Sequence, residues 1–247
     1  MLALGSTSRD GSDANPPPTR SGTSPAIIDS SKVHGHLGKN AAKRCHGGAR
    51  NRADRVSYQL TDKQVRGIFE AVTRASAIGL PLNRHWTVHW DLAGVTDDKA
   101  GAATRALLTL VRDWLRKQGH RFACVWVREN DEGDGSKGSH VHILLHVPAK
   151  VRWCGWRNRR WLERVTSSVY VKRTSRTRVV GRSLNDTSST SRQFQINLAN
   201  VTSYIVKSAA DNVLSNHGIC RQADSGSILG KRWGRCATLS MQGRVNP

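Results

Sequence analysis

Residues 138–147 read Gly-Ser-His-Val-His-Ile-Leu-Leu-His-Val, and this stretch decides the fold that the sequence predicts. Its valine, isoleucine and leucine content, followed by Pro148, is typical of a β-strand. Side chains two residues apart leave the same face of a strand, with backbones about 7 Å apart. His140 and His142 therefore share one face, while the residues that alternate with them face a core.

Two imidazoles on one face of an apolar strand indicate either a metal site or a pair of ordinary hydrogen-bonded histidines. His146 has the same parity, but it lies about 13 Å beyond His142 along the strand. That distance is too long for His146 to bind the same ion. The strand alone leaves both interpretations open.

The residues before the histidine strand predict a helix, a strand, a second helix and a second strand, over 61–78, 85–91, 97–118 and 122–129. A capping box of Thr61 and Gln64 begins the first helix. The second strand reaches the histidine strand through the short connection 131–138. Strands joined by so short a loop are antiparallel, so the pattern predicts an α+β fold rather than a doubly wound one.

The composition points to a polyanionic partner. The chain of 247 residues has 39 Lys and Arg against 18 Asp and Glu, which gives a net charge of +21. Such a charge opposes compaction unless a polyanion binds, so nucleic acid is the expected partner. No long apolar run or basic amphipathic helix favours a membrane. Five scattered cysteines without a C-x-x-C pair predict reduced thiols in the cytoplasm.

The chain divides into three segments by composition. Residues 1–55 predict a flexible basic tail, 56–215 a single domain, and 216–247 a basic C-terminal extension. The tail lacks the apolar block of a secretory signal. A zinc site within it remains an alternative, with the candidate ligands His34, His36, Cys45 and His46.

Residues 150–182 form a basic segment in which tryptophans are interspersed. The segment has eleven Lys and Arg and a single acid, Glu163. Alternating arginine and aromatic side chains suit phosphate contacts and base stacking. The alternative is that the tryptophans belong to the core and the arginines to a solvated surface. The expected DNA contacts are Arg152, Trp156, Arg157, Arg159, Arg160, Arg164, Lys172 and Arg173.

A last helix is predicted over 198–215, after a loop at 181–192. It carries Tyr204 and Lys207, whose i, i+3 spacing would put both side chains on one face of the helix. A phenol is a poor nucleophile unless a cation stabilises its ionised form, and Lys207 would be placed to do so. Most Tyr-x-x-Lys pairs are ordinary surface residues, so this pair indicates a function only in combination with the other motifs.

The ordered combination of these motifs resembles the HUH endonucleases, in particular the rolling-circle replication initiators (Rep proteins) of plasmids and small phages. The matching residues are His140-Val141-His142 and the Ser203–Lys207 stretch, and the match covers about residues 84–210. The Trp86–Trp90 stretch stands where the family has its first motif. The resemblance implies a ferredoxin-like antiparallel sheet, with the histidine strand central and helices packed on one face.

The resemblance also implies a metal-dependent transesterification of single-stranded DNA. His140 and His142 would bind Mn²⁺ or Mg²⁺ with a third ligand on the preceding strand, for which Glu129 is chosen and Asp131 or Glu132 are reserves. A salt bridge with an arginine is the alternative role for Glu129. Tyr204, the single tyrosine of its helix, would attack the phosphodiester, leave a 5′-phosphotyrosyl link and release a 3′-hydroxyl.

The implied setting is a bacterial cytoplasm, with a replication origin as the substrate. The chain lacks a phosphate-binding GxxxxGK[ST] loop, so a host helicase and polymerase are the expected partners. Three alternatives remain open: a transposase or relaxase of the same superfamily, a non-enzymatic DNA- or RNA-binding protein, and a hydrolytic nuclease that does not use Tyr204.

Overall fold

The computed structural model describes residues 54–131, 138–181, 191–220, 223 and 226–240. The predicted tail before residue 54, with its candidate zinc ligands, lies outside these residues. So do most of the predicted 181–192 loop and the reserve ligand Glu132. Nothing below concerns those segments.

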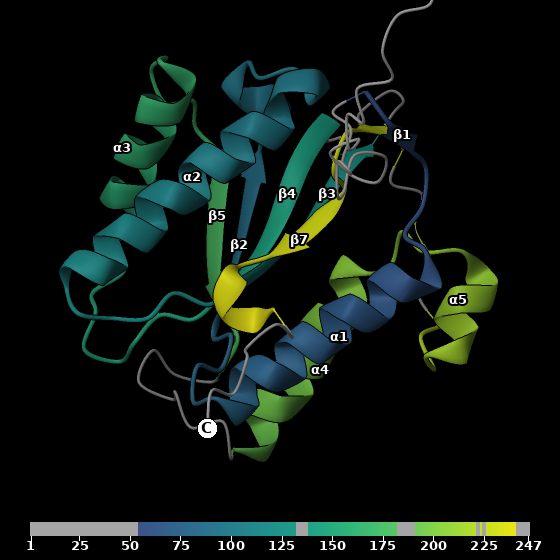
Figure 1. The fold of residues 1–247 in the computed structure, drawn as a ribbon. Coiled ribbons are helices and arrows are strands. Elements are labelled where there is room, and N and C mark those ends of the chain that lie inside the picture. Colours follow the sequence, from purple (N-terminus) through teal and green to yellow (C-terminus); the bar gives the residue numbers. More distant parts are fainter. Residues whose placement is uncertain (1–53, 132–137, 182–190, 221–222, 224–225, 241–247) are drawn as a thin grey trace, which may run out of the picture. The chain divides into compact units, whose positions relative to one another are not determined.

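Five antiparallel strands form the main sheet, and the histidine strand is its centre (Figure 1). The strand order across the sheet is β5 (Ser175–Val179), β2 (Arg84–His89), β4 (Gly138–Leu145), β3 (Cys124–Asp131) and β7 (Trp233–Arg235). A separate two-stranded ribbon pairs β1 (Val56–Ser57) with β6 (Ile228–Leu229). The predicted antiparallel sheet and the central position of residues 138–147 are therefore confirmed.

The helices complete an α+β fold, as predicted. Their bounds are α1 (Asp62–Ala77), α2 (Asp97–Lys117), α3 (Gly155–Thr166), α4 (Arg192–Ile205) and α5 (Asp211–Asn216), with 3₁₀ turns η1 (Asp91–Ala93) and η2 (Ala237–Leu239). The Thr61–Gln64 capping box is present at the start of α1. The series β2-α2-β3-β4-α3-β5, with its strand order, has the ferredoxin-like arrangement. None of the described helices has the length and apolar character of a membrane span.

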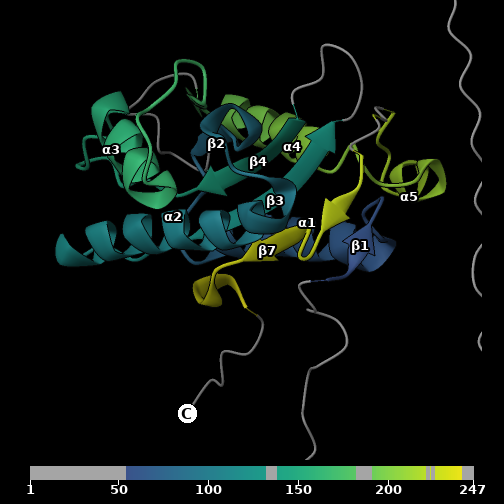
Figure 2. The same ribbon diagram turned by 90° about the horizontal axis from the view of Figure 1, so that it is seen from above.

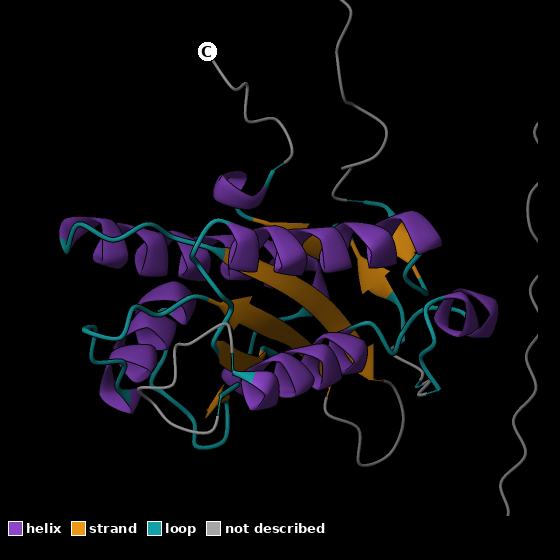
Figure 3. Ribbon diagram, turned by 90° about the horizontal axis from the view of Figure 1, so that it is seen from below, coloured by secondary structure: helices purple, strands orange, loops and turns teal. Residues whose placement is uncertain are grey.

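Helices cover both faces of the sheet, so the expectation of helices on one face was wrong (Figure 3). The two crossover helices, α2 and α3, pack on the face that carries Trp86, Val141 and Ile143. α1 and α4 pack on the opposite face, against Val127 and Leu144. Because side chains alternate along a strand, the sheet separates two hydrophobic cores. The imidazoles of His140 and His142 lie on the α1 and α4 face.

The helix predicted over 198–215 is interrupted, which is a second correction. α4 ends at Ile205 and α5 starts at Asp211. Between them, the carbonyl oxygen of Ser208 accepts a hydrogen bond from Leu60 N (3.1 Å), and Lys207 O accepts one from Ala223 N (3.0 Å). These carbonyls are used by distant parts of the chain instead of a continuing helix. Lys207 therefore lies beyond the end of α4 rather than on its face.

Within the predicted extension 216–247, the described residues 226–240 pack on the domain rather than forming a separate extension. Their strand β7 pairs with β3 at the edge of the main sheet (Figure 2). Two glycines make this close packing possible. A Cβ atom at Gly234 would lie 2.6 Å from the Trp126 ring, and one at Gly67 of α1 would lie 2.8 Å from the Trp233 ring.

Asp97, the first residue of α2, ties the same region together. Its Oδ1 accepts hydrogen bonds from Ser139 Oγ (2.9 Å) and from the buried guanidinium of Arg128, and its Oδ2 accepts one from Leu229 N (2.7 Å). One carboxylate at a helix N-terminus thus links α2 to β3, β4 and β6.

We expect Gly234→Ala to lower the free energy of unfolding by about 1–3 kcal/mol, because the new methyl group overlaps the Trp126 ring. Urea denaturation measures the change. Gly155→Ala is the matched control, since a Cβ at Gly155 would meet nothing within 4 Å. Equal midpoints for the two variants would show that β7 does not pack as described.

Candidate functional site

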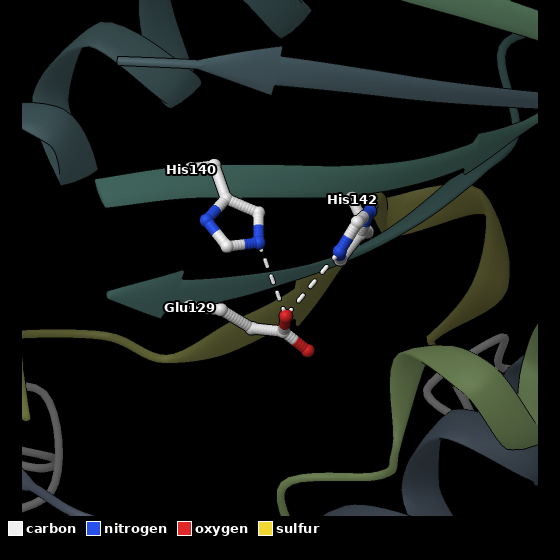
Figure 4. Close-up of side chains that lie close together, drawn as sticks. All are labelled: Glu129, His140 and His142. Carbon is white, nitrogen blue, oxygen red and sulfur yellow. Dashed lines mark hydrogen bonds and ion pairs between the residues drawn. The ribbon is translucent and has the colours of Figure 1, made fainter. Parts of the chain in front are cut away.

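Glu129, His140 and His142 converge on one point of the sheet (Figure 4). Glu129 on β3 is the cross-strand partner of His140 on β4. The Nε2 atoms of His140 and His142 lie 3.1 and 3.3 Å from Glu129 Oε2. All three side chains are buried. The structure therefore brings together the two predicted histidine ligands and the chosen third ligand.

The donor set of this group fits a cation. His140 Nδ1 lies 2.8 Å from the carbonyl oxygen of Gly138, which only accepts, so Nδ1 carries the hydrogen. In neutral His140 the lone pair of Nε2 then faces a carboxylate oxygen. Neighbouring ligands with metal bonds of about 2.1 Å lie about 3 Å apart, close to the separations observed. Glu129 Oε1 is buried and accepts no hydrogen bond from the described residues.

Lys207 is the cation that Glu129 contacts in this structure. The Lys207 ammonium donates a hydrogen bond to Glu129 Oε2, the same oxygen that both histidines approach. Burial acts to raise the pKa of Glu129, but its close contacts with His140 and His142 and the Lys207 charge outweigh burial and lower the pKa. Glu129 is therefore a carboxylate at neutral pH. Its partners are histidines and a lysine, so the predicted alternative of an arginine salt bridge does not apply.

Two residues of β2 hold His142 in place. His142 Nδ1 lies 3.2 Å from His85 Nε2 and 3.1 Å from Thr87 Oγ1. These contacts orient its Nε2 toward Glu129, as outer partners of a metal ligand do. Burial lowers the pKa of His142, and Glu129 opposes that shift. Burial, His142 and Arg178 lower the pKa of His85 to about 3, so His85 is neutral at pH 7.

A cavity of about 570 Å³ opens above the histidines. His140, His142 and Tyr204 all line it. The Tyr204 ring centroid is 5.2 Å from that of His142, and Lys207 Nζ is 4.7 Å from the Tyr204 ring centroid. The structure thus places the predicted nucleophile beside the predicted metal ligands. Lys207 is close to both, although it is not on the same helix face as Tyr204.

Several lining residues were not among the predicted site residues. β2 contributes His85, Thr87 and His89, and the edge strand β5 contributes Arg176 and Arg178. Because side chains alternate along a strand, the sequence of β2 by itself puts Thr87 and His89 on one face. The pairing that brings His89 opposite His140 and Arg176 opposite Thr87 is between distant segments, and no local pattern reveals it.

Asp131, the reserve ligand that the structure describes, does not belong to the Glu129, His140 and His142 group. His146 is also separate, as predicted, because its Nδ1 lies 2.8 Å from the carbonyl oxygen of Pro81.

The predicted DNA contacts lie away from this cavity. Trp156, Arg157, Arg159, Arg160 and Arg164 belong to α3, which covers the opposite face of the sheet; Arg152 precedes α3, and Lys172 and Arg173 precede β5. None of the eight lines the cavity.

The tryptophans of the basic segment divide into two kinds. Trp153 and Trp161 pack with Trp86 and Trp114 against the core, so the alternative of core residues holds for them. Trp156 is 57% exposed. Whether the exposed arginines and Trp156 contact DNA stays a prediction.

Comparison of the chain with protein-family models, with curated proteins and with solved structures found no match.

We expect Lys207→Met to lower the melting temperature of the metal-free protein and to strengthen Mn²⁺ binding about tenfold or more. The substitution leaves the Glu129 carboxylate without its cation and removes a positive charge from the metal position. Calorimetry with Mn²⁺ and thermal melts measure both effects. Lys150→Met, at an exposed position, is the control. Weaker Mn²⁺ binding by Lys207→Met would contradict the idea that Lys207 and the metal ion compete for Oε2 of Glu129.

We expect the metal-free protein to lose stability as the pH falls from 6.5 to 5, and His85→Asn to reduce that loss. Below about pH 6.5 the unfolded chain binds a proton at His85 that the folded protein, with its lowered pKa, does not bind. In the variant, the slope of the free energy of unfolding against pH should be smaller by up to about 1 kcal/mol per pH unit. Urea titrations in EDTA measure it, with His120→Asn as the control. Equal slopes for wild type and His85→Asn would refute the assignment.

Proposed function

We propose that this protein is a metal-dependent, single-tyrosine endonuclease that nicks and rejoins single-stranded DNA. The observation that carries the proposal is that Tyr204 lines the same cavity as His140 and His142, the two histidines that converge on Glu129. Neither motif is specific alone. A nucleophile, a cation-binding group and basic side chains around one cavity together match the needs of phosphoryl transfer.

The three buried ligands would hold Mn²⁺ or Mg²⁺. When bound, such an ion supplies Lewis-acid polarisation of the scissile phosphate. The neutral state of His142, which burial favours, leaves its Nε2 lone pair available to the ion. The orientation by His85 and Thr87 keeps that atom directed at Glu129.

Tyr204 would be the nucleophile. Its phenolic oxygen would lose its proton and attack phosphorus, the bond from phosphorus to the 3′-oxygen would break, and that oxygen would gain a proton and leave as a hydroxyl. The product is a 5′-phosphotyrosyl link, which can be reversed to rejoin the strand. The Lys207 ammonium, 4.7 Å from the ring centroid, would stabilise negative charge that develops on Tyr204 during the attack.

Arg176 and Arg178 would bind the phosphates that flank the scissile bond. Both are exposed on the edge strand β5, and both line the cavity. They project from the same face as His85 and Thr87, their cross-strand neighbours. This position suits a strand of DNA that crosses the cavity between β5 and α4.

We expect Tyr204→Phe to reduce nicking by roughly 10³-fold or more and to abolish the covalent adduct, because the variant lacks the attacking oxygen. The assay uses random-sequence single-stranded 40-mers with Mn²⁺, followed by mass spectrometry of the tryptic peptide Gln193–Lys207. Tyr58→Phe, at an exposed position, is the matched control.

The outcomes separate the alternatives. A Tyr204→Phe variant that cuts at full rate would indicate a hydrolytic nuclease, and binding without cutting or adduct would indicate a non-enzymatic binding protein. An adduct at Tyr204 supports the endonuclease. Initiation of rolling-circle replication at an origin is the biological role that we propose, ahead of transposition or conjugative transfer.

A further inference from the structure

A second cavity of about 340 Å³ lies between α3 and the edge strand β5, on the opposite face of the sheet from Tyr204. Figure 1 shows α3 near the edge of the sheet that β5 forms. The residues that matter for its chemistry are Arg84, Trp153, Asn158, Tyr170, Thr177 and Arg178. The volume is at the small end of the roughly 300–1,000 Å³ typical of ligand sites, which favours a small occupant.

The cavity contains a buried cation without an acidic partner. Arg84 is only 5% exposed, and its guanidinium donates a hydrogen bond to the carbonyl oxygen of Asn83 (2.9 Å). No carboxylate of the described residues pairs with Arg84, and none of the residues lining the cavity is acidic. A buried charge without a counter-ion is costly, so this arrangement favours a ligand that carries negative charge.

Two further polar atoms of the lining are unsatisfied. Asn158 is 4% exposed; its Nδ2 donates to Thr177 Oγ1 (3.0 Å), but its Oδ1 is buried without a hydrogen-bond partner. Trp153 Nε1 is likewise buried without an acceptor. One unsatisfied acceptor and one unsatisfied donor, beside the Tyr170 ring, match a flat group with its own donor and acceptor. Nucleobases have this chemistry.

The two cavities meet at β5. One face of β5, with Ser175, Thr177 and Val179, is the face of the second cavity. The other face, with Arg176 and Arg178, is that of the cavity lined by Tyr204. Arg178 and Val179 line both cavities. Because β5 is an edge strand of the described sheet, a polyanion can pass over it without displacing a neighbouring strand.

We propose that the cavity between α3 and β5 binds one nucleotide of the substrate strand, with the base inside and the phosphate toward Arg84 and Arg178. This inference rests on the proposed function for the identity of the strand. It separates recognition of a base, on one face of the sheet, from cleavage on the other. The cavity would thereby contribute to the choice of nick site.

The test is an NMR titration of the metal-free protein with each of the four deoxynucleoside 5′-monophosphates, and separately with inorganic phosphate. The eight tryptophans of the chain give indole signals, and Trp153→Phe assigns that of Trp153. We expect at least one nucleotide to shift the Trp153 signal saturably. Asn158→Leu should weaken that binding about tenfold, as expected for the loss of one hydrogen bond in a desolvated site.

Asn200→Leu is the matched control, because Asn200 lines the catalytic cavity instead and its loss should leave the Trp153 shift unchanged. The remaining indole signals report whether each variant is folded. The proposal is overturned if none of the four nucleotides shifts Trp153, if phosphate alone gives the same shift, or if Asn158→Leu binds as wild type does. Neither a metal ion nor Tyr204 takes part in this nucleotide titration. Its result therefore tests the second cavity even if the protein fails to nick DNA.

Discussion

The buried carboxylate of Glu129 is the constraint on which the site and much of the fold depend. A fully buried carboxylate is several kcal/mol too costly unless it is paired and hydrogen-bonded. Here it meets two imidazoles from the adjacent strand and an ammonium group from the segment after α4. Because Lys207 belongs to that segment, the ion pair also bears on where α4 ends. The position of Tyr204, three residues earlier, is therefore coupled to the charge at the centre of the sheet.

The parts of the structure that the sequence predicts well are local. Strand alternation placed His140 and His142 on one face, and the short connection between β3 and β4 brought Glu129 opposite His140. The capping box of α1 and the apolar period of α2 likewise depend on neighbouring residues. Where both the pattern and the pairing lie within one hairpin, the site could be assembled from the sequence alone.

The parts that the sequence did not predict depend on distant contacts. The interruption after Ile205 reflects backbone hydrogen bonds to Leu60 and Ala223, which compete with a continuing helix. The incorporation of β7 depends on two glycines whose partners are rings far along the chain. Composition also cannot tell a core tryptophan from a base-stacking one. Trp153 and Trp161 found partners in Trp86 and Trp114, which precede them by tens of residues.

The alternation of β5 has a consequence for how this protein can change. Its arginines and its hydroxyl-bearing residues project from different faces of the sheet. Arg176 pairs with Thr87 of β2, and Thr177 pairs with Trp86. Substitution of Arg176 alters only the cavity beside Tyr204, and substitution of Ser175 or Thr177 alters only the second cavity, whereas Arg178 and Val179 line both. A single-residue insertion or deletion within the strand would instead exchange the two sets, so that charge would enter the core face and hydroxyl groups would face Tyr204. Among variants that keep both cavities, β5 should therefore vary in composition but keep a constant length.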